Sequence, residues 1–474
     1  MRHALRESRG LGKDSRSHSG VTGGNVLTCR RRTFRAAASV AALLMLSVLV
    51  AACGSSSISS TSSKTATTAG AGIPGFKVIA GTDIPTATVR YGLLPYGDNS
   101  MPVIGMQKGW FKDVGIKINP QPVGSKVQDN QVVPKLVNDE IDMINWDGTV
   151  IIQTMTQAPD LKQIGFTDTY LGIYILAAPN SDTKTVSELT ANGTSFSDAM
   201  QQSIQQLKGK KVALDNTGYH RSFFNTVFDL GGIKPSDMDL TTIDDAKMVQ
   251  LAKAGKINFA SPAGAAQNTE LLGLGWKPVV GVEDLLTGLP PGDKRSVGTL
   301  DNIGPALNQK YLDAHPDTVL RAMSVNFRIV DQILKNPNAT LPVQVPYLES
   351  VTGGNYTLND LKLIYGKINP LTSFDQQGKY WTEPKNPQYY RNIYDPQIKA
   401  LQKGGVLPKG QDLNASQVII GTEIYNQMLA LKQQYEKLAP DAEKKNPSLA
   451  AKAKIQAANF NYLDAARFAL AATE

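Results

Sequence analysis

Two stretches of the sequence repeat the same succession of short apolar runs and helix-period segments, and this repeat constrains the fold more than any other feature. In each stretch a helical segment lies between two apolar runs. Ile116 and Ile141 mark the runs of the first stretch, 25 residues apart, and Ile233 and Ile257 mark those of the second, 24 apart. The matched spacing predicts two similar α/β lobes, with a single sheet built from two unrelated units as the alternative.

The other apolar runs predict further strands and a helical C-terminal half. Strands are expected at residues 88–94, 115–118, 141–144, 163–166, 172–176, 211–214 and 257–260. Helices are expected at 102–111, 219–230, 245–254, 358–365, 395–403 and 416–437, with a long loop at 370–394 and a peripheral helix at the Ala/Lys-rich end. Val319, Met323, Phe327, Val330 and Leu334 form an apolar stripe at helical spacing, which predicts one more helix.

The positive charge of the chain is concentrated at its start. The formal net charge is +8, but residues 1–52 alone hold nine basic and two acidic residues. The rest of the chain is nearly neutral, with 40 basic and 39 acidic residues, so the charge gives no reason to expect a nucleic-acid partner. The basic start and the apolar run at 36–52 are typical of an export signal. Arg31-Arg32-Thr33-Phe34 resembles a twin-arginine motif, which leaves the export route open.

The signal ends in Val50-Ala51-Ala52-Cys53, which resembles a bacterial lipobox. Cys53 is therefore the expected lipidation site, and an ordinary cleaved signal with a chance cysteine is the alternative. The Ser/Thr/Gly-rich residues that follow cannot bury enough apolar surface to fold and predict a flexible tether. The expected organisation is an export signal with lipobox at 1–52, a lipidated Cys and tether at 53–85, lobe one at 86–180, lobe two at 181–275, a return to lobe one at 276–340 and a mostly helical C-terminal extension at 341–474.

Enzyme and metal motifs are largely missing from the sequence. Residues 70–75 match G-x-G-x-x-G, but they lie in the tether and carry a Pro where a helix should begin. Neither a G-x-S-x-G nor a Walker-type motif is present. Beyond Cys53 the sequence holds no cysteine and only two histidines, His220 and His315, so a Cys/His metal site within one chain is excluded. We therefore expect no catalytic residues, no metal and no cofactor.

Four polar loops each follow a predicted strand and open a predicted helix, at residues 96–100, 145–149, 216–220 and 261–264. Ligands of α/β proteins bind at the carboxyl ends of strands, where free helix N–H groups favour anions. Two loops come from each repeat, so we expect them to face one another across a cleft. The predicted ligand-binding residues are Tyr96, Asn99, Ser100, Trp146, Asp147, Thr149, Thr217, Gly218, Tyr219, His220 and Ser261.

Structural roles are the alternative for these residues. Helix capping alone would account for Ser100 and Ser261, and core packing would account for Trp146. His220 could donate to an anionic ligand or simply lie at a solvated helix start. Tyr170, which precedes the strand expected at the hinge, is a weaker candidate for the site.

Five short motifs occur in a fixed order along the chain. They are IGMQKGWFKDVGI at 104–116, DEID at 139–142, LKGKKVA at 207–213, AGKIN at 254–258 and YLDAHP at 311–316. Together they resemble the solute-binding proteins of nitrate, sulfonate and taurine ABC transporters, a family that also includes binders of thiamine pyrimidine precursors. Asp139 stands where the family usually has Gly, and Asn258 where it has Asp. The similarity covers roughly residues 86–340.

This resemblance implies an α/β fold of two lobes, of the type II periplasmic-binding-protein kind, here with a helical C-terminal extension. It implies a non-enzymatic solute-binding component of an ABC importer, whose partners are a small-molecule ligand and the permease and ATPase subunits. With the lipobox, the expected location is the outer face of the cytoplasmic membrane. The expected solute is a small organic one, anionic or heteroaromatic, such as a sulfonate, a nitrate-like anion, an aromatic acid or a pyrimidine.

Two other functions stay open. One is a ligand-binding sensor or partner protein at the membrane surface. The other is an enzyme related to pyrimidine synthase, which the sequence disfavours because the characteristic cysteine cluster of that enzyme is absent. Genes for a permease and an ATPase beside this one would favour the importer over both.

Overall fold

The computed structural model describes residues 72–215 and 220–474. The export signal, Cys53, the first part of the tether and the loop residues Thr217, Gly218 and Tyr219 lie outside the described residues, so what we expect of them stays a prediction. None of the described helices combines the length and the apolar character that crossing a membrane requires.

The first lobe is built on a mixed sheet. Its strands are β1 (Ala87–Leu93), β2 (Ile116–Asn119), β3 (Ser125–Lys126), β4 (Met143–Asp147), β5 (Leu161–Gln163), β6 (Asp168–Tyr170) and β12 (Asp301–Asn308). The main strands follow the order β2-β1-β4-β12-β5, with β3 paired to β1 and β6 paired to β12. Strands β1, β2 and β4 run parallel, whereas β12 pairs antiparallel with β4 and β5.

The second lobe is built on a five-stranded sheet. Its strands are β7 (Tyr174–Ala177), β8 (Lys211–Leu214), β9 (Asp239–Thr242), β10 (Phe259–Ser261) and β11 (Lys277–Gly281). They follow the order β11-β7-β10-β8-β9. Strands β8, β9 and β10 run parallel, and β7 pairs antiparallel with β10 and β11.

The two sheets share one topology. The order β2-β1-β4-β12-β5 of the first corresponds, strand for strand and in direction, to β9-β8-β10-β7-β11 of the second. The predicted pair of similar α/β lobes is therefore confirmed. Ile116 begins β2, whereas Ile233 lies, as expected, in the turn before the matching strand: the short helix η2 (Pro235–Asp237) follows it, and β9 starts at Asp239.

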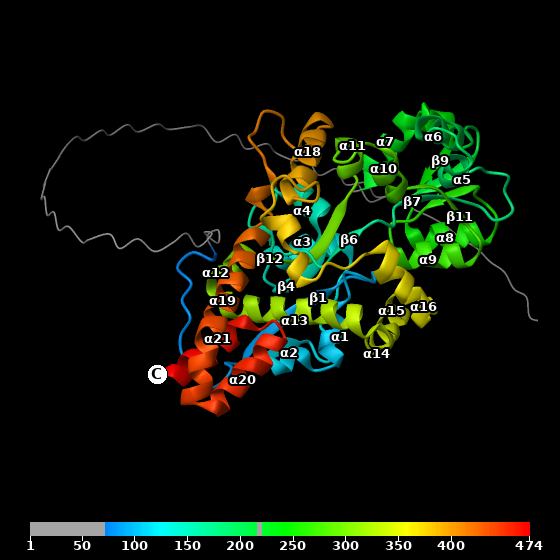
Figure 1. Cartoon of the computed structure of the whole chain (residues 1–474). Helices are drawn as coiled ribbons and strands as arrows, with labels where there is room; N and C mark the ends of the chain where they lie inside the picture. The colour runs from blue at the N-terminus through cyan, green and yellow to red at the C-terminus, as the bar shows by residue number, and fades with distance from the viewer. Residues whose placement is uncertain (1–71, 216–219) are drawn as a thin grey trace, which may run out of the picture. The chain divides into compact units, whose positions relative to one another are not determined.

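The chain crosses between the lobes twice, and each crossing contains a glycine. Residues 171–173 with Gly172 join β6 to β7, and residues 298–300 with Gly298 join α11 (Lys294–Val297) to β12. Strand β7 thus belongs to the second lobe ahead of the boundary expected at residue 180. Strand β11 also stays in the second lobe, so the return to the first lobe takes place after Val297 and not at residue 276. Figure 1 shows the second lobe as the green part of the ribbon.

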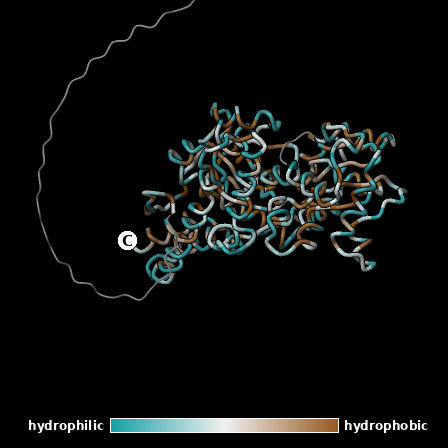
Figure 2. Tube along the Cα trace, turned by 90° about the horizontal axis from the view of Figure 1, so that it is seen from above, coloured by the Kyte–Doolittle hydropathy of each residue, from teal (hydrophilic) through white to brown (hydrophobic). Residues whose placement is uncertain are grey.

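Helix α13 (Pro316–Lys335) forms much of the core of the first lobe. Val319, Met323 and Val330 of the predicted stripe are at most 1% exposed, but Leu334, in the last turn, is 51% exposed. The helix packs on α1 (Pro102–Gln107), and a Cβ at Gly105 of α1 would lie 2.9 Å from side chains of α13. Apolar and hydrophilic stretches alternate along the trace through both lobes, as such amphipathic elements require (Figure 2).

The helix predicted over 102–111 is in fact two. Helix α1 ends at Gln107, and α2 (Trp110–Asp113) begins after Gly109. Gly109 has a φ of 76°, a left-handed conformation that favours glycine and interrupts the regular helix.

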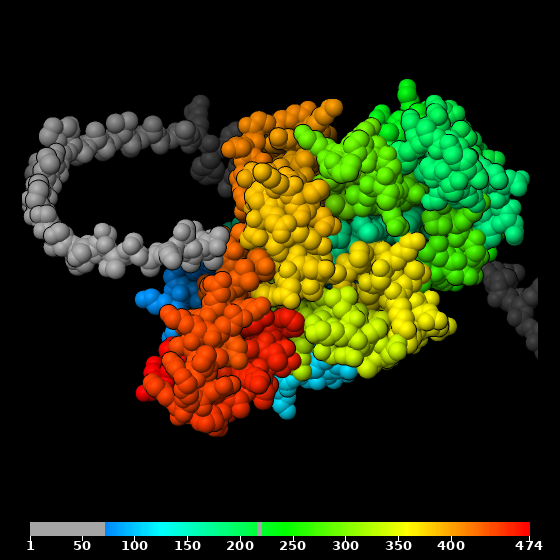
Figure 3. Space-filling view, viewed as in Figure 1, coloured from blue at the N-terminus to red at the C-terminus, as the bar shows by residue number. Residues whose placement is uncertain are grey.

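The predicted helical C-terminal extension is confirmed, and it covers much of the face seen in Figure 3. Its main helices are α18 (Tyr390–Lys403), α19 (Gly421–Lys445), α20 (Pro447–Ala458) and α21 (Tyr462–Thr473). The end of the chain is not peripheral, because Asp464 of α21 is fully buried and forms an ion pair of 2.7 Å with Arg321 of α13. The loop expected at 370–394 contains α17 (Gly378–Trp381), with Tyr380 and Trp381 buried in the core.

The C-terminal helices also hold the segment that precedes β1. Arg467 Nε of α21 donates a hydrogen bond of 3.1 Å to the carbonyl oxygen of Ile79. Lys452 Nζ of α20 donates to the carbonyl oxygen of Thr82, also at 3.1 Å. The extension therefore fixes the start of the described chain to the first lobe.

Candidate ligand-binding site

The loops that the sequence singled out do follow the carboxyl ends of strands. Residues 96–100 follow β1, Asp147 ends β4 and precedes α4 (Gly148–Thr154), and Ser261 ends β10 and precedes α9 (Ala265–Gly273). Because β1 and β4 are parallel neighbours, as are β8 and β10, each sheet presents its polar loops at one edge.

A small cavity lies between these loops and is lined by both lobes. Its free volume is only about 10 Å³, so the loops of the two lobes lie almost against one another and leave room for about one water molecule. Its lining residues are Tyr96, Asp98, Asn99 and Asp147 of the first lobe, Tyr170 of β6, and Ala263, Gly264 and Ala265 of the second lobe. The structure thus brings three of the predicted residues, Tyr96, Asn99 and Asp147, to one cavity.

Two tyrosines form the aromatic part of this cavity. The Tyr96 hydroxyl donates a hydrogen bond of 2.6 Å to Asp129. The Tyr170 hydroxyl donates to the carbonyl oxygen of Ala263 and accepts a bond of 3.1 Å from Asn268 of α9. Tyr170 therefore links the first sheet to the second lobe beside the cavity. In the sequence analysis it was only a weaker candidate for the site.

Most other predicted site residues lie in the core behind the cavity. Trp146 is 2% exposed, and its carbonyl oxygen accepts a hydrogen bond of 2.9 Å from Gln163. Ser100 is fully buried and donates to the carbonyl oxygen of Tyr96 at 2.5 Å, which is a structural role within the turn. Thr149 and Ser261 are also buried and do not line the cavity.

His220 lies behind Tyr170 and not on the cavity wall. Its imidazole is fully buried, and Nδ1 is 2.9 Å from Oδ2 of Asp215. Its ring stacks on that of Tyr170 with centroids 5.9 Å apart. The described contacts of His220 support the tyrosine that faces the cavity.

Four aspartates converge beside the cavity, and the sequence analysis selected only one of them. Asp147 ends β4 and is partly exposed, whereas Asp98, Asp168 and Asp301 are at most 5% exposed. Among the described residues, no lysine or arginine forms an ion pair with any of the four. The cluster is therefore a concentration of buried acidic groups, with His220 as the basic residue that acts on Asp301.

Burial raises the pKa of every carboxyl in the cluster. The pKa of Asp98 and that of Asp301 rise to about 6, and those of Asp147 and Asp168 rise well above their ordinary value. Repulsion from the neighbouring carboxylates adds to burial at Asp147 and Asp168, while hydrogen bonds oppose it. The cluster therefore exchanges protons close to neutral pH as a coupled group.

The C-terminal extension contributes one residue to this cluster. Asn369 Nδ2 donates to Oδ2 of Asp98 at 2.8 Å and to Oδ1 of Asp168 at 3.0 Å. It follows the short π-helical segment η4 (Ile364–Ile368). No sequence motif indicated Asn369. Asp168 and Asp301 could have been noticed in the sequence, because each is a single acidic residue in a segment that forms a strand.

No metal centre occurs in the described part of the chain. No group of three or more His, Cys, Asp or Glu side chains there has the geometry to hold a metal ion. The aspartate cluster thus does not form a metal cage from these residues.

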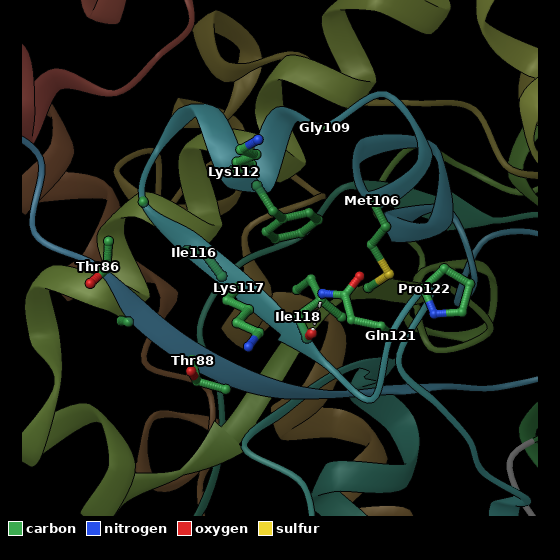
Figure 4. A pocket seen from close by; sticks show the side chains of 13 residues that line it. Thr86, Thr88, Met106, Gly109, Lys112, Ile116, Lys117, Ile118, Gln121 and Pro122 are labelled. Atoms are coloured by element: carbon green, nitrogen blue, oxygen red, sulfur yellow. Dashed lines mark hydrogen bonds between the residues drawn. The ribbon is translucent and has the colours of Figure 1, made fainter.

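A wider hollow lies at the outer edge of the first sheet, lined by Met106, Phe111 and the edge strand β2 (Figure 4). Thr86 and Thr88, which also line it, lie at the start of β1. Gln121 and Pro122, which follow the end of β2, complete the lining, so this hollow runs along the edge strand β2 and lies apart from the cavity between the lobes.

Comparison with known proteins gives a family match over part of the chain. A model of the NMT1-like family matches residues 82–262, which is less than half of the chain. Among curated proteins, none matches the sequence significantly.

Solved structures that match include three with different described roles. The periplasmic aliphatic sulphonate-binding protein SsuA of Escherichia coli shares 14% identity at a TM-score of 0.48, covering 69% of this chain and 95% of that one. The periplasmic nitrate-binding protein NrtA of Synechocystis PCC 6803 shares 13% at 0.45, covering 72% and 88%. The desulfurization enzyme DSZB shares 12% at 0.44, covering 72% and 99%. At these identities none of them indicates a ligand or a reaction for this chain.

Proposed function

We propose that the protein is the extracytoplasmic solute-binding component of an ABC importer, that it holds a small organic solute between its lobes, and that it carries out no catalysis. The observation that carries the proposal is the cavity at the carboxyl ends of both sheets, lined by Tyr96, Asp98, Asn99 and Asp147 on one side and by residues 263–265 on the other. The NMT1-like match over residues 82–262 supports the same class.

Hinge closure is the proposed mechanism. A ligand that touches both lobes stabilises the closed form, and the permease then recognises that form. Within residues 72–215 and 220–474 the chain passes between the lobes at residues 171–173 and 298–300, and a glycine in each connection lets the backbone absorb a rotation. Tyr170 lies directly before the first connection, so its contacts with Ala263 and Asn268 would tighten as the cavity closes.

The lipid anchor is a separate part of the proposal. Cys53 would carry the lipid, and the Ser/Thr/Gly-rich residues after it would tether the lobes to the outer face of the cytoplasmic membrane. The contacts of α20 and α21 with residues 79 and 82 support this arrangement, because they hold the end of the tether against the first lobe, away from the cavity.

Small-angle X-ray scattering with and without ligand tests the proposal. A solute that raises the melting temperature should also reduce the radius of gyration, because binding closes the cleft. A ligand that binds in the cavity and leaves the scattering curve unchanged would count against an importer component. The gene neighbourhood gives a second test: a permease and an ATPase beside the gene are expected, and a membrane-sensor gene alone would favour the sensor.

A further inference from the structure

The helix N-termini at the cavity are already occupied by the protein's own carboxylates. Asp245 accepts hydrogen bonds from the backbone N–H groups of Ala263 (2.9 Å) and Gly264 (2.7 Å), directly before α9. Asp301 Oδ1 accepts from the N–H of Thr149 (3.1 Å) in the first turn of α4. These are the donors that a sulfonate or a nitrate would otherwise use, so they are not available to an anionic solute.

The cavity lining offers an anion no other positive group. None of the described lining residues is a lysine or an arginine. Residues 216–219, which lie outside the described residues, read Asn-Thr-Gly-Tyr in the sequence and include no basic residue. An anion would instead lie beside the carboxyls of Asp98 and Asp147, where like charges repel most strongly in a poorly solvated site.

The same lining suits a cation. Asp98 and Asp147 supply charged acceptors, and the rings of Tyr96 and Tyr170 supply aromatic surface, the combination that proteins use for ammonium groups. Asp301 adds to the acidic character behind the cavity wall: it does not line the cavity, and its buried Oδ2 accepts no hydrogen bond from any described residue. Asp301 belongs to the cluster with Asp98 and Asp147, because its charge raises the pKa of both.

We propose that the cavity binds a small organic cation, a solute with an ammonium or another positively charged N–H group, and not an oxyanion. This binding requires the lobes to open, because the space between them is now only about 10 Å³; the charged nitrogen would then lie against Asp98 and Asp147, and the organic part between Tyr96 and Tyr170. The inference rests on the proposed function only in taking the cavity between the lobes as the ligand site.

Charge-inverted probe pairs of similar size test this inference. Benzylammonium is compared with benzoate, and methylammonium with methanesulfonate, by isothermal titration calorimetry and thermal shift on the full exported domain, with probes up to roughly 10 mM so that millimolar affinities are detected. The two cations should bind and raise the melting temperature, and their anionic counterparts should not. The variant Asp147→Asn keeps the shape of the side chain and should weaken benzylammonium roughly tenfold or more, as loss of a desolvated charge partner does.

Two further variants make the outcome specific. Asp98→Asn removes the other lining charge and should weaken benzylammonium in the same way. Asp412→Asn removes an exposed carboxylate far along the C-terminal extension and should leave binding unchanged. The inference is overturned if an anion binds more tightly than its cationic counterpart, if no cation binds, or if neither cavity variant weakens the cation.

Failure of this inference differs measurably from failure of the proposed function. If benzoate or methanesulfonate binds and reduces the radius of gyration, the solute-binding role stands and the cationic class is wrong. If benzylammonium binds through Asp147 but the scattering curve does not change, the cationic class stands and the importer role is in doubt.

Discussion

The variant Asp301→Asn should stabilise the protein at neutral pH, which is the reverse of what most substitutions in a core do. Asp301 is 3% exposed, and burial raises its pKa from the ordinary 3.8 to about 6. A tenfold change in proton affinity corresponds to about 1.4 kcal/mol, so ionised Asp301 costs the folded state roughly 3 kcal/mol at about pH 7. Asparagine avoids this cost.

The local geometry favours the replacement. The side-chain oxygen of asparagine can still accept the hydrogen bond that Thr149 N–H now donates to Oδ1 over 3.1 Å. The new amide group takes the place of Oδ2, which has no hydrogen-bond partner among the described residues.

The pH dependence has a definite sign. A group whose pKa is higher in the folded state stabilises the fold fully below its unfolded pKa, and this stabilisation is lost as the pH rises through the folded pKa. For Asp301 the loss therefore takes place between about pH 4 and about pH 7. The variant lacks this loss, so its advantage over the wild type should be roughly 3 kcal/mol at the upper end and close to zero at the lower end.

Urea denaturation followed by circular dichroism at several pH values measures this difference. The free energy of unfolding of each form is obtained by linear extrapolation, and the two pH profiles are subtracted. Asp412→Asn is the matched control, because this exposed residue should show no such pH-dependent gain. The reasoning is refuted if Asp301→Asn is less stable than the wild type at neutral pH, or if its advantage does not shrink as the pH falls.

Three further predictions concern the core and the anchor. Arg321→Met removes the 2.7 Å partner of the buried Asp464, which keeps Arg467 at 2.8 Å, and should lower the free energy of unfolding by about 1–3 kcal/mol in urea titrations; an unchanged midpoint would contradict it. Gly304→Ala places a Cβ 2.2 Å from the carbonyl oxygen of Gly165 and should cost about 1–3 kcal/mol or more, read as a lower melting temperature. Cys53→Ser should move the protein from the membrane fraction to the soluble fraction, and retention in the membrane would argue against the lipid anchor.

The sequence predicted the fold correctly where an element depends on the pattern of neighbouring residues. The spacing of apolar runs predicted both lobes, since strand and helix periods differ in a way that neighbouring residues reveal. It placed the strand of residues 211–214 at its observed bounds. It was less accurate where the chain passes between lobes, because β7 and β11 pair with strands far away in the sequence and no local pattern indicates which sheet they join.

In the candidate site, too, some residues could be predicted from the local sequence and others could not. Tyr96, Asn99 and Asp147 line the cavity, and each follows a predicted strand directly, so the rule on carboxyl ends of strands was sufficient for them. Trp146 comes from the same loop but points into the core, since successive side chains of a strand face opposite sides and only the register decides which side is buried. Asn369 reaches Asp98 from 271 positions further along the chain, which no local pattern can indicate.

What the sequence determined by itself was the class of the protein: the two α/β lobes, the helical extension, the loops that bound a ligand site, and the expectation of export with an anchor at Cys53. Only the tertiary structure decided the chemistry of the cavity. Asp98, Asp147, Asp168 and Asp301 are isolated acids in the sequence, and the sheet order alone brings them together. Their protonation differs from that of exposed acids because folding removes water from around them: burial, which is a property of the folded chain and not of any residue, raises their pKa values.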